Sequence, residues 1–526
     1  MDLTLNRWKA FLIVLLIWAA IYLPSLGKPE FKGEEGRRVM PAITMLQTGN
    51  WIVPSVGGED YHSKPPGINW LVALSFALTG QQTELAARLP SAFFTLAFVS
   101  LLIWMPNSYL GLSGRLIAAI VFLTNIKVIE KGRLIEIEGV YIALTGLATL
   151  WWINSWSRNS SRWALWIVPS IIIGFGMLVK GPFILIFFYC TVIAVLWYGR
   201  KVKDLFAVQH IAGIALFSIM VLGWLYLAYQ HTDSDKMTSR MTSQLLIRIL
   251  PRNIKFINRG AEVIEAFLNF LPWLLFVPIL WDKKLVSRIA PEHTALFKGC
   301  RLGLVISFAI INLMPGAQSR YSLPAFPLAS LLVGWAMSLR EGFTRFDRFW
   351  KNVLLGGILI ICPAAITGLF TITRTLAAFV VTALAVCAAV IVFRKRDLLR
   401  GTLSLTLATA AVIVVIMLQY AVFGVTLVTR YENRRPAAAM VNNAVPSDQI
   451  VYVFKPGYQA FLYYVRPPVK YLLEDDQVTG DVHYLLLKQE DWERLENQPH
   501  ILSRTPKILC RLPDSILKHF RLVKLE

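Results

Sequence analysis

A segment near the start of the chain places two acids directly before two bases. Residues 33–38 read GEEGRR, so Glu34 and Glu35 precede Arg37 by three and two positions. A carboxylate can take a proton from a hydroxyl group and a guanidinium group binds phosphate, so this spacing favours acid–base chemistry beside an anion. Apolar residues at positions 39, 43 and 46 keep helical spacing and predict a helix along a membrane surface. The simpler alternative is that these charges only begin that helix and pair with lipid headgroups.

Charged residues recur in four later connections between apolar runs. Lys64 lies in YHSKPPG, Glu138 in GRLIEIEG, Lys180 in GFGMLVKGP, and Arg320 with Tyr321 in SRYSLP. A single basic residue at such a position often serves as a membrane anchor whose charge reaches the interface. Acids and bases that converge on one face instead predict an acid–base site beside a clamp for an anionic group.

Apolar helices must position these residues, because the chain has too few charges for a soluble protein. Of its 526 residues, 56% are hydrophobic and 16% are charged, against about 25% charged residues in soluble domains. Runs of apolar residues near the length of a membrane span recur along the chain. We predict an all-α polytopic membrane protein with thirteen transmembrane helices, at residues 9–26, 89–106, 113–126, 139–156, 163–179, 182–198, 207–229, 264–281, 302–314, 321–338, 352–371, 375–393 and 402–427.

The charge distribution predicts the orientation of these helices. The net charge is +21, and the excess lies before residue 426, where 39 Lys and Arg face 20 Asp and Glu. The short loops on one side hold 21 basic residues and those on the other side hold six. Because basic short loops stay in the cytoplasm, the N-terminus is predicted inside, and the long loops 28–88 and 230–262 outside. Anionic lipid accounts for the basicity better than nucleic acid does.

The last hundred residues have a different composition. Charges are frequent there, and short β-rich runs at 450–454 and 482–487 alternate with helix-like stretches at 459–465 and 490–497. This pattern is typical of a small α/β domain. We therefore predict a membrane domain at residues 1–428 and an α/β domain at residues 429–526, outside the membrane.

Two further features restrict the function. No acid lies at the middle of a predicted span, whereas ion-coupled transporters usually keep ionisable groups there. The five cysteines have no regular spacing, so the sequence predicts neither a disulfide framework nor a thiolate metal site. The chemistry is expected at one membrane surface.

The order of the motifs resembles one protein family. The strings GEEGRRVMPAITMLQTGNWIVP, YHSKPPGINWLVALSFALTG, AARLPS, GRLIEIEG, GFGMLVKGP and SRYSLPAFPLA follow one another between residues 33 and 329. They resemble the bacterial GT-C membrane glycosyltransferases, in the branch that holds the lipid A aminoarabinose transferases and relatives of the protein O-mannosyltransferases. The resemblance covers residues 10–340 and specifies the superfamily better than the substrate.

The resemblance implies a GT-C fold and an inverting glycosyltransferase of the bacterial inner membrane. The donor would be a sugar linked to a polyprenyl phosphate. The acceptor would be a periplasmic-side hydroxyl of lipid A, another envelope glycan or a protein. The family pattern assigns the general base to the first acid and donor phosphate binding to the lysine before the prolines. The expected site comprises the catalytic acids Glu34, Glu35 and Glu138 and the phosphate-binding residues Arg37, Lys64, Lys180, Arg320 and Tyr321.

Two positions depart from the family pattern. Glu34 stands where the family usually has Asp, which lengthens the reach of the base, so Glu34 and Glu35 remain alternatives for that role. The aminoarabinose transferases also carry an acid before the lysine, where it helps hold a metal ion, and here that residue is Ser63. His62 and His231 are then the remaining candidate ligands for a divalent metal ion, and no cofactor is certain.

The sequence leaves two alternative functions open. An O-antigen ligase or polymerase-like transferase would use a diphosphate-linked donor, and a lipid or glycan transporter would have paired half-repeats and charges at the midplane. The basic residues of the second long loop are expected either to contact phosphate or lipid A, or to bind headgroups in general. They are Arg240, Arg248, Arg252, Lys255 and Arg259.

Overall fold

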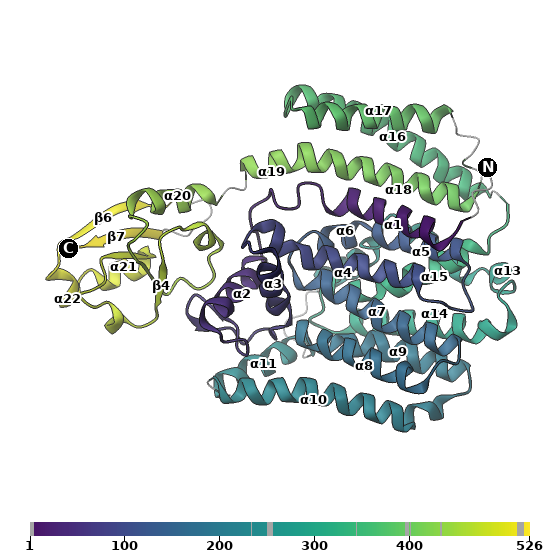
Figure 1. Ribbon diagram of the computed structural model, residues 1–526, viewed down its shortest axis with the longest axis horizontal. Coiled ribbons are helices and arrows are strands. Elements are labelled where there is room, and N and C mark those ends of the chain that lie inside the picture. Colours follow the sequence, from purple (N-terminus) through teal and green to yellow (C-terminus); the bar gives the residue numbers. More distant parts are fainter. Residues whose placement is uncertain are drawn as a thin grey trace.

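The computed structural model describes a mostly helical protein with a β-sheet at one end (Figure 1). The described residues are 5–232, 234–249, 256–342, 344–394, 399, 401–431, 434–512 and 520–526. The helices lie side by side in layers, and the C-terminal sheet stands beyond the end that carries α2 and α3.

The helical part contains long apolar helices joined by short connections. Its long helices are α1 (Arg7–Tyr22), α4 (Glu84–Trp104), α5 (Leu112–Leu123), α7 (Ile137–Ser157), α8 (Arg162–Val179), α9 (Phe183–Tyr198), α10 (Val208–Gln230), α14 (Pro291–Leu313), α15 (Phe326–Ser338), α16 (Arg345–Thr371), α17 (Leu376–Arg394) and α18 (Thr402–Gln419). The shorter helices between and after them are α6 (Ile126–Gly132), α11 (Ser234–Ile249), α12 (Phe256–Leu268), η2 (Trp273–Trp281), α13 (Lys283–Val286), η3 (Ser319–Ala325) and α19 (Val425–Tyr431).

The helices agree with the predicted apolar runs, since each of these runs overlaps a helix. By length and composition, six described helices can cross a membrane, or eight if two bent pairs each count as one span. The bent pairs are α5 with α6 and α12 with η2, and they turn by 67° and 89°. The protein is therefore a multi-pass membrane protein, and the number thirteen stays a prediction.

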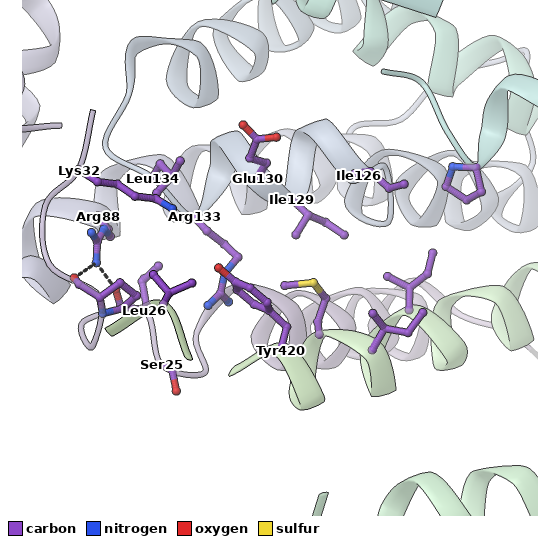
Figure 2. Close-up of a pocket in the computed structure, with 16 residues that line it drawn as sticks. Ser25, Leu26, Lys32, Arg88, Ile126, Ile129, Glu130, Arg133, Leu134 and Tyr420 are labelled. Atoms are coloured by element: carbon purple, nitrogen blue, oxygen red, sulfur yellow. Dashed lines mark hydrogen bonds between the residues drawn. The ribbon is translucent and has the colours of Figure 1, made fainter. Parts of the chain in front are cut away.

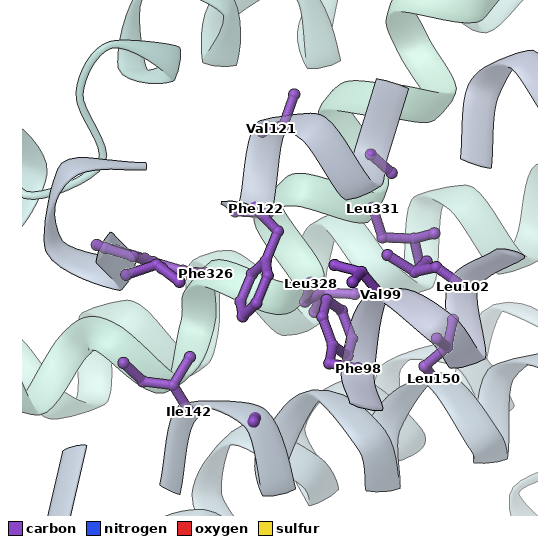
Figure 3. Close-up of a cluster of buried hydrophobic side chains, with 14 of the residues drawn as sticks. Phe98, Val99, Leu102, Val121, Phe122, Ile142, Leu150, Phe326, Leu328 and Leu331 are labelled. Carbon is purple, nitrogen blue, oxygen red and sulfur yellow. The ribbon is translucent and has the colours of Figure 1, made fainter. Parts of the chain in front are cut away.

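The centre of the helical part is formed by α4, α5, α7 and α15. Phe98 and Phe122 meet there with ring centroids 4.5 Å apart, and Ile142 and Leu331 lie beside them (Figure 3). A Cβ atom added at Gly334 would lie 2.6 Å from the Cβ of Ala118, so α15 and α5 approach closely only because this residue is a glycine. Close contact through small residues is what holds helices together in lipid, where the hydrophobic effect contributes little.

Two short helices cover the end of the helical part nearest the sheet. The predicted surface helix is confirmed as α2 (Gly36–Thr48), and it packs against α3 (Gly67–Thr79). A small antiparallel hairpin, β1 (Ser55–Val56) and β2 (Glu59–Asp60), connects them. The placement of α2 along a membrane surface stays a prediction.

The C-terminal unit, as we name residues 434–526, contains a five-stranded mixed sheet. Strands β3 (Val451–Phe454), β4 (Val469–Leu472) and β5 (Tyr484–Lys488) are parallel, whereas β6 (Pro506–Arg511) and β7 (Phe520–Leu525) add antiparallel pairs in the order β4-β3-β5-β7-β6. Helices α20 (Arg435–Ala444), η6 (Ala460–Tyr464), η7 (Asp475–Gln477), α21 (Gln489–Leu495) and α22 (Pro499–Leu502) accompany the sheet. The two predicted β-rich runs are strands, and the stretch 459–465 forms only a short 3₁₀ turn.

Candidate functional site

The turn before α2 holds Glu34 at the surface. Its carboxylate accepts from Arg37 Nη1 at 2.9 Å and from Arg38 Nη2 at 3.3 Å, and 40% of its side chain is exposed. Arg38 also donates to the hydroxyl of Tyr61 at 3.2 Å, while Asn69 donates to the Arg38 carbonyl at 2.8 Å. Two guanidinium groups thus orient an accessible carboxylate.

Glu35 points in the opposite direction and is fully buried. Its two oxygens accept from Arg88 Nε and Nη2, both at 2.8 Å. The backbone N–H groups of Lys32 and Ile135 also donate to it, each at 3.1 Å. Arg88 uses its remaining donors on the carbonyls of residues 26, 29 and 30. This buried pair ties the turn to α4 and to the chain before α7.

Lys180 lies at the end of α8 and is also buried. Its ammonium group is 3.2 Å from Glu138 Oε1 and lies over the rings of Tyr141 and Tyr321, 5.3 and 5.1 Å from their centroids. Arg320 approaches the same carboxylate oxygen at 3.9 Å from the exposed side. Lys180, Glu138 and Arg320 thus lie close together, and the two tyrosine rings add cation–π contacts that stabilise the ammonium group.

The turn before α2 and the Lys180 cluster belong to elements that touch one another. A Cβ atom at Gly67 would lie 2.7 Å from the carbonyl oxygen of Leu178, so α3 begins against the end of α8. Lys64 precedes this contact by three residues, and Lys180 follows it by two. The bond from the Ile135 amide to Glu35 joins the same region to the start of α7. The predicted site residues therefore gather at one end of the helical part, and Lys64 is half-buried there.

The two histidines do not complete a metal site. His62 Nε2 lies 3.2 Å from the hydroxyl of Thr232, which donates to Asp60 at 2.6 Å. His231 Nδ1 lies 2.8 Å from the carbonyl of Leu227 in its own helix. Among the described residues, no three His, Cys, Asp or Glu side chains group in a way that could hold a metal ion. His62 and His231 therefore do not belong to a group of three such ligands in the described part of the chain.

The structure describes the contacts of only one of the five basic residues predicted in the second long loop. Arg259 donates to the carbonyls of Asn312 and Ala317, so it fastens α12 to the end of α14. Arg252 and Lys255 lie outside the described residues. The contacts of Arg240 and Arg248 with phosphate or headgroups stay predictions.

Two apolar cavities adjoin this end of the protein. The first has a volume of about 540 Å³ and lies between α6 and α18, with Lys32, Arg88 and Arg133 at its polar side. Figure 2 shows Lys32 and Arg88 at one end of it and Ile126 toward the other. The second, of about 480 Å³, is lined almost entirely by apolar side chains from α12, η2, α14 and α15. It begins beside η3, the turn that carries Arg320 and Tyr321.

Sequence reasoning missed three residues of this region. Arg88 was counted in the loop 28–88, whereas it lies in the second turn of α4. An arginine inside an apolar helix is a signal that could have identified it, because such a charge needs a buried partner. Tyr141 and Tyr458 gave no such signal. Tyr458 comes from the C-terminal unit, and its hydroxyl contacts the turn at Gly33 and Gly36.

Comparison with known proteins supports the resemblance read from the motifs. Residues 63–226 match the family model described as dolichyl-phosphate-mannose-protein mannosyltransferase, and this segment contains Lys64, Glu138 and Lys180. Two relatives, from Pectobacterium atrosepticum and Aeromonas salmonicida, carry the name undecaprenyl phosphate-alpha-4-amino-4-deoxy-L-arabinose arabinosyl transferase. Each is 25% identical to this chain, and the matches cover 70% and 69% of this chain respectively. The matches cover 66% and 65% of these relatives, just under two thirds.

The fold matches a solved structure along nearly the whole chain. The crystal structure of ArnT from Cupriavidus metallidurans in the apo state superposes with a TM-score of 0.71 at 16% identity and covers 97% of both chains. A second structure of that protein, bound to undecaprenyl phosphate, gives a TM-score of 0.70 at 15% identity, again with 97% of both chains covered. These matches establish the fold.

Proposed function

We propose that this chain, which has the GT-C fold, is an inverting glycosyltransferase of the bacterial inner membrane. It would move a sugar from a polyprenyl-phosphate donor to a hydroxyl group of a membrane lipid on the periplasmic side. The observation that carries the proposal is the presence of an accessible carboxylate, Glu34, and a buried cation, Lys180, at the same end of the helices and beside two apolar cavities.

Glu34 is the better candidate for the general base. A base needs a free path from its carboxylate to the acceptor hydroxyl. Glu34 is partly exposed, whereas Glu35 is buried and accepts from Arg88 and two backbone amides. Burial and these four donors keep Glu35 away from a substrate, so we assign it the role of holding the turn.

Lys180, Arg320 and Tyr321 are suited to the donor phosphate. Cleavage of the sugar–phosphate bond leaves negative charge on the phosphate, which nearby cations stabilise in the transition state. Glu138 contacts both Lys180 and Arg320, so it is placed to orient these cations. Lys64 and Arg37 would complete the clamp from the side of α2 and α3.

The two cavities accommodate two lipid tails. The second cavity, beside Arg320 and Tyr321, is suited to the polyprenyl chain because it is almost wholly apolar. The first cavity combines an apolar wall with Lys32 at one end, which suits an amphiphilic acceptor with an anionic group. Lys32 lies two residues from Glu34, so the polar group of such an acceptor would reach the base.

Transfer assays with the purified full-length protein in lipid nanodiscs test this function. We expect transfer from undecaprenyl-phosphate-linked 4-amino-4-deoxy-L-arabinose, the sugar in the relatives' names, to lipid A, with inversion of the anomeric configuration seen by NMR. Glu34→Gln protein serves as the blank. Transfer from a diphosphate-linked sugar alone would instead support the ligase or polymerase alternative. No transfer from a panel of polyprenyl-phosphate sugars would contradict the proposal.

The assignment of the two cavities has its own test. Ile416 and Leu313 line the first and second cavity respectively, and both side chains are substantially exposed, so a larger side chain requires little repacking. Ile416→Trp should raise KM for the acceptor only, and Leu313→Trp should raise KM for the donor only. The reverse pattern would assign the donor to the first cavity and the acceptor to the second. If neither variant changes either KM, both assignments are contradicted.

The orientation follows the distribution of basic residues. With the N-terminus in the cytoplasm, the site and the C-terminal unit lie in the periplasm. Alkaline phosphatase fused after Val425 should be active, and the same enzyme fused after Arg200 should be inactive. The opposite result would place the site in the cytoplasm.

A further inference from the structure

The loop after β3 brings one tyrosine of the C-terminal unit onto the turn that carries Glu34. The Tyr458 hydroxyl donates to the Gly33 carbonyl at 2.7 Å and accepts from the Gly36 amide at 3.1 Å. Its ring lies under the guanidinium of Arg37, whose Cζ is 4.9 Å from the ring centroid. One side chain therefore bridges both ends of the turn and contacts the partner of Glu34.

We propose that Tyr458 is a positioning residue that fixes Glu34 and Arg37 for the transfer reaction. The inference rests on the proposed function, in which Glu34 is the general base. Arg88 holds the turn through Glu35, and Tyr458 holds it through Gly33 and Gly36. Glu34 lies between these two attachments, and its carboxylate contacts Arg37 at the surface and the buried Arg38.

The fit between Tyr458 and the turn is close. A Cβ atom at Gly36 would lie 2.6 Å from the Tyr458 hydroxyl, so a glycine is needed there. Gly36 is the first residue of α2, where the backbone N–H has no partner within the helix, and Tyr458 supplies one. Burial raises the pKa of the Tyr458 hydroxyl, which keeps its proton available for the Gly33 carbonyl.

The loop itself is shaped to present this side chain. Lys455 and Gly457 both adopt positive φ angles, +40° and +58°. A positive φ is uncommon for a lysine and indicates a backbone constrained by its surroundings. The neighbouring Gly57, before β2, would place a Cβ 2.6 Å from the Gly457 carbonyl, so the loop is also pressed against the β1–β2 hairpin.

The C-terminal unit has other attachments that do not involve Tyr458. Arg435 donates to Glu84 at 2.7 Å, and the Tyr464 hydroxyl donates to the same carboxylate at 3.1 Å while it accepts from the Phe31 amide at 2.9 Å. The Tyr463 hydroxyl donates to the Gln82 carbonyl. Removal of the Tyr458 hydroxyl should therefore loosen the turn without releasing the unit.

Tyr458→Phe, which removes the hydroxyl and keeps the ring, tests the proposal, and Tyr463→Phe is the matched control. We expect kcat to fall about tenfold in Tyr458→Phe, with KM for the donor within about twofold of the wild type, the pattern of a lost transition-state interaction. Tyr458→Leu, which also removes the ring beneath Arg37, should lose more. Tyr463→Phe should keep wild-type kcat and the same melting temperature as Tyr458→Phe.

A double-mutant cycle separates positioning from a general structural effect. If Tyr458 acts through Glu34, the change to Phe should cause no further loss in a Glu34→Gln background. A full additional loss of about tenfold would show that Tyr458 acts elsewhere and would overturn the proposal.

Hydrogen exchange supplies a readout that is independent of activity. The peptide covering residues 30–40 should exchange faster in Tyr458→Phe than in Tyr463→Phe, because the Gly36 amide loses its acceptor. If the wild-type protein transfers no sugar but the peptide still exchanges faster in Tyr458→Phe, the proposed function is refuted. The role of Tyr458 in holding the turn is then retained. Unchanged exchange together with unchanged kcat would overturn the role of Tyr458.

Discussion

The turn before α2 and the hairpin between α8 and α9 use the same chemistry in different surroundings. Both pair a glutamate with basic residues, but Glu138 and Lys180 are buried together, whereas Glu34 shares the surface with Arg37. In the turn, the next residue, Glu35, belongs to a pair that is more deeply buried still. Burial thus separates Glu35 and Glu138, whose carboxylates are enclosed, from Glu34, whose carboxylate is accessible.

The contrast between Glu34 and Glu35 gives the largest expected effect. Glu34→Gln preserves the shape of the side chain and removes the proton acceptor, so turnover should fall by roughly 10²–10⁴-fold. Donor binding, measured by equilibrium titration, should persist. Glu34→Asp should retain part of the activity because it restores a shorter carboxylate. If Glu34→Gln keeps wild-type turnover, the accessible acid is not the base.

Substitution of Glu35 should lower the free energy of unfolding. Glu35→Gln leaves Arg88 buried without a charged partner, which should cost about 3–5 kcal/mol of unfolding free energy. Thermal unfolding in detergent would measure the loss. The double variant Glu35→Met with Arg88→Met removes both charges and should recover only part of it, because the backbone groups that the pair satisfies lose their partners. A folded Glu35→Gln protein of wild-type stability would contradict the structural role.

The buried lysine of the hairpin should affect donor binding. Lys180→Met removes a charge-assisted contact worth roughly 1.5–3 kcal/mol, so kcat/KM for the donor should fall by about 10- to 150-fold. Lys180→Arg keeps the charge and should lose less. The KM for the acceptor should stay unchanged and serves as the internal control. An equal rise in the KM values for donor and acceptor would point to a general distortion.

The smallest expected effect belongs to Lys64. It is only half buried, so Lys64→Ala should reduce kcat/KM for the donor by about tenfold, equivalent to about 1.4 kcal/mol, the lower end of a charge-assisted contact. Expression and melting temperature should match the wild type. Wild-type kinetics at subsaturating donor would mean that Lys64 is only a surface anchor.

Much of the fold could be predicted from the sequence because its signals are local. Each predicted apolar run contains a helix, since hydrophobic length and bounding polar residues are properties of a short segment. The Lys180 hairpin and the start of α2 were found in the same way. The breaks between α5 and α6 and between α12 and η2 were not predicted, because a bend of 67° or 89° depends on what packs against it.

The residues of the candidate site could be predicted from the sequence, whereas their arrangement in space could be predicted only in part. The spacing GEEGRR shows two equivalent acids, and nothing in it distinguishes Glu34 from Glu35. The distinction comes from Arg88, which lies 53 residues further along the chain. Tyr458 is 422 residues from Gly36, so its contribution could be seen only once the chain was folded.

The contacts between residues 30–36 and the C-terminal unit join segments of the chain that are synthesised far apart in time. The ribosome produces this turn before Arg434, Tyr458 and Tyr464, which lie 404, 422 and 433 residues after the residues that they contact. Until these residues are made, the turn lacks its outer contacts. Under the proposed function, sugar transfer would begin only after the C-terminal unit has folded back onto the turn.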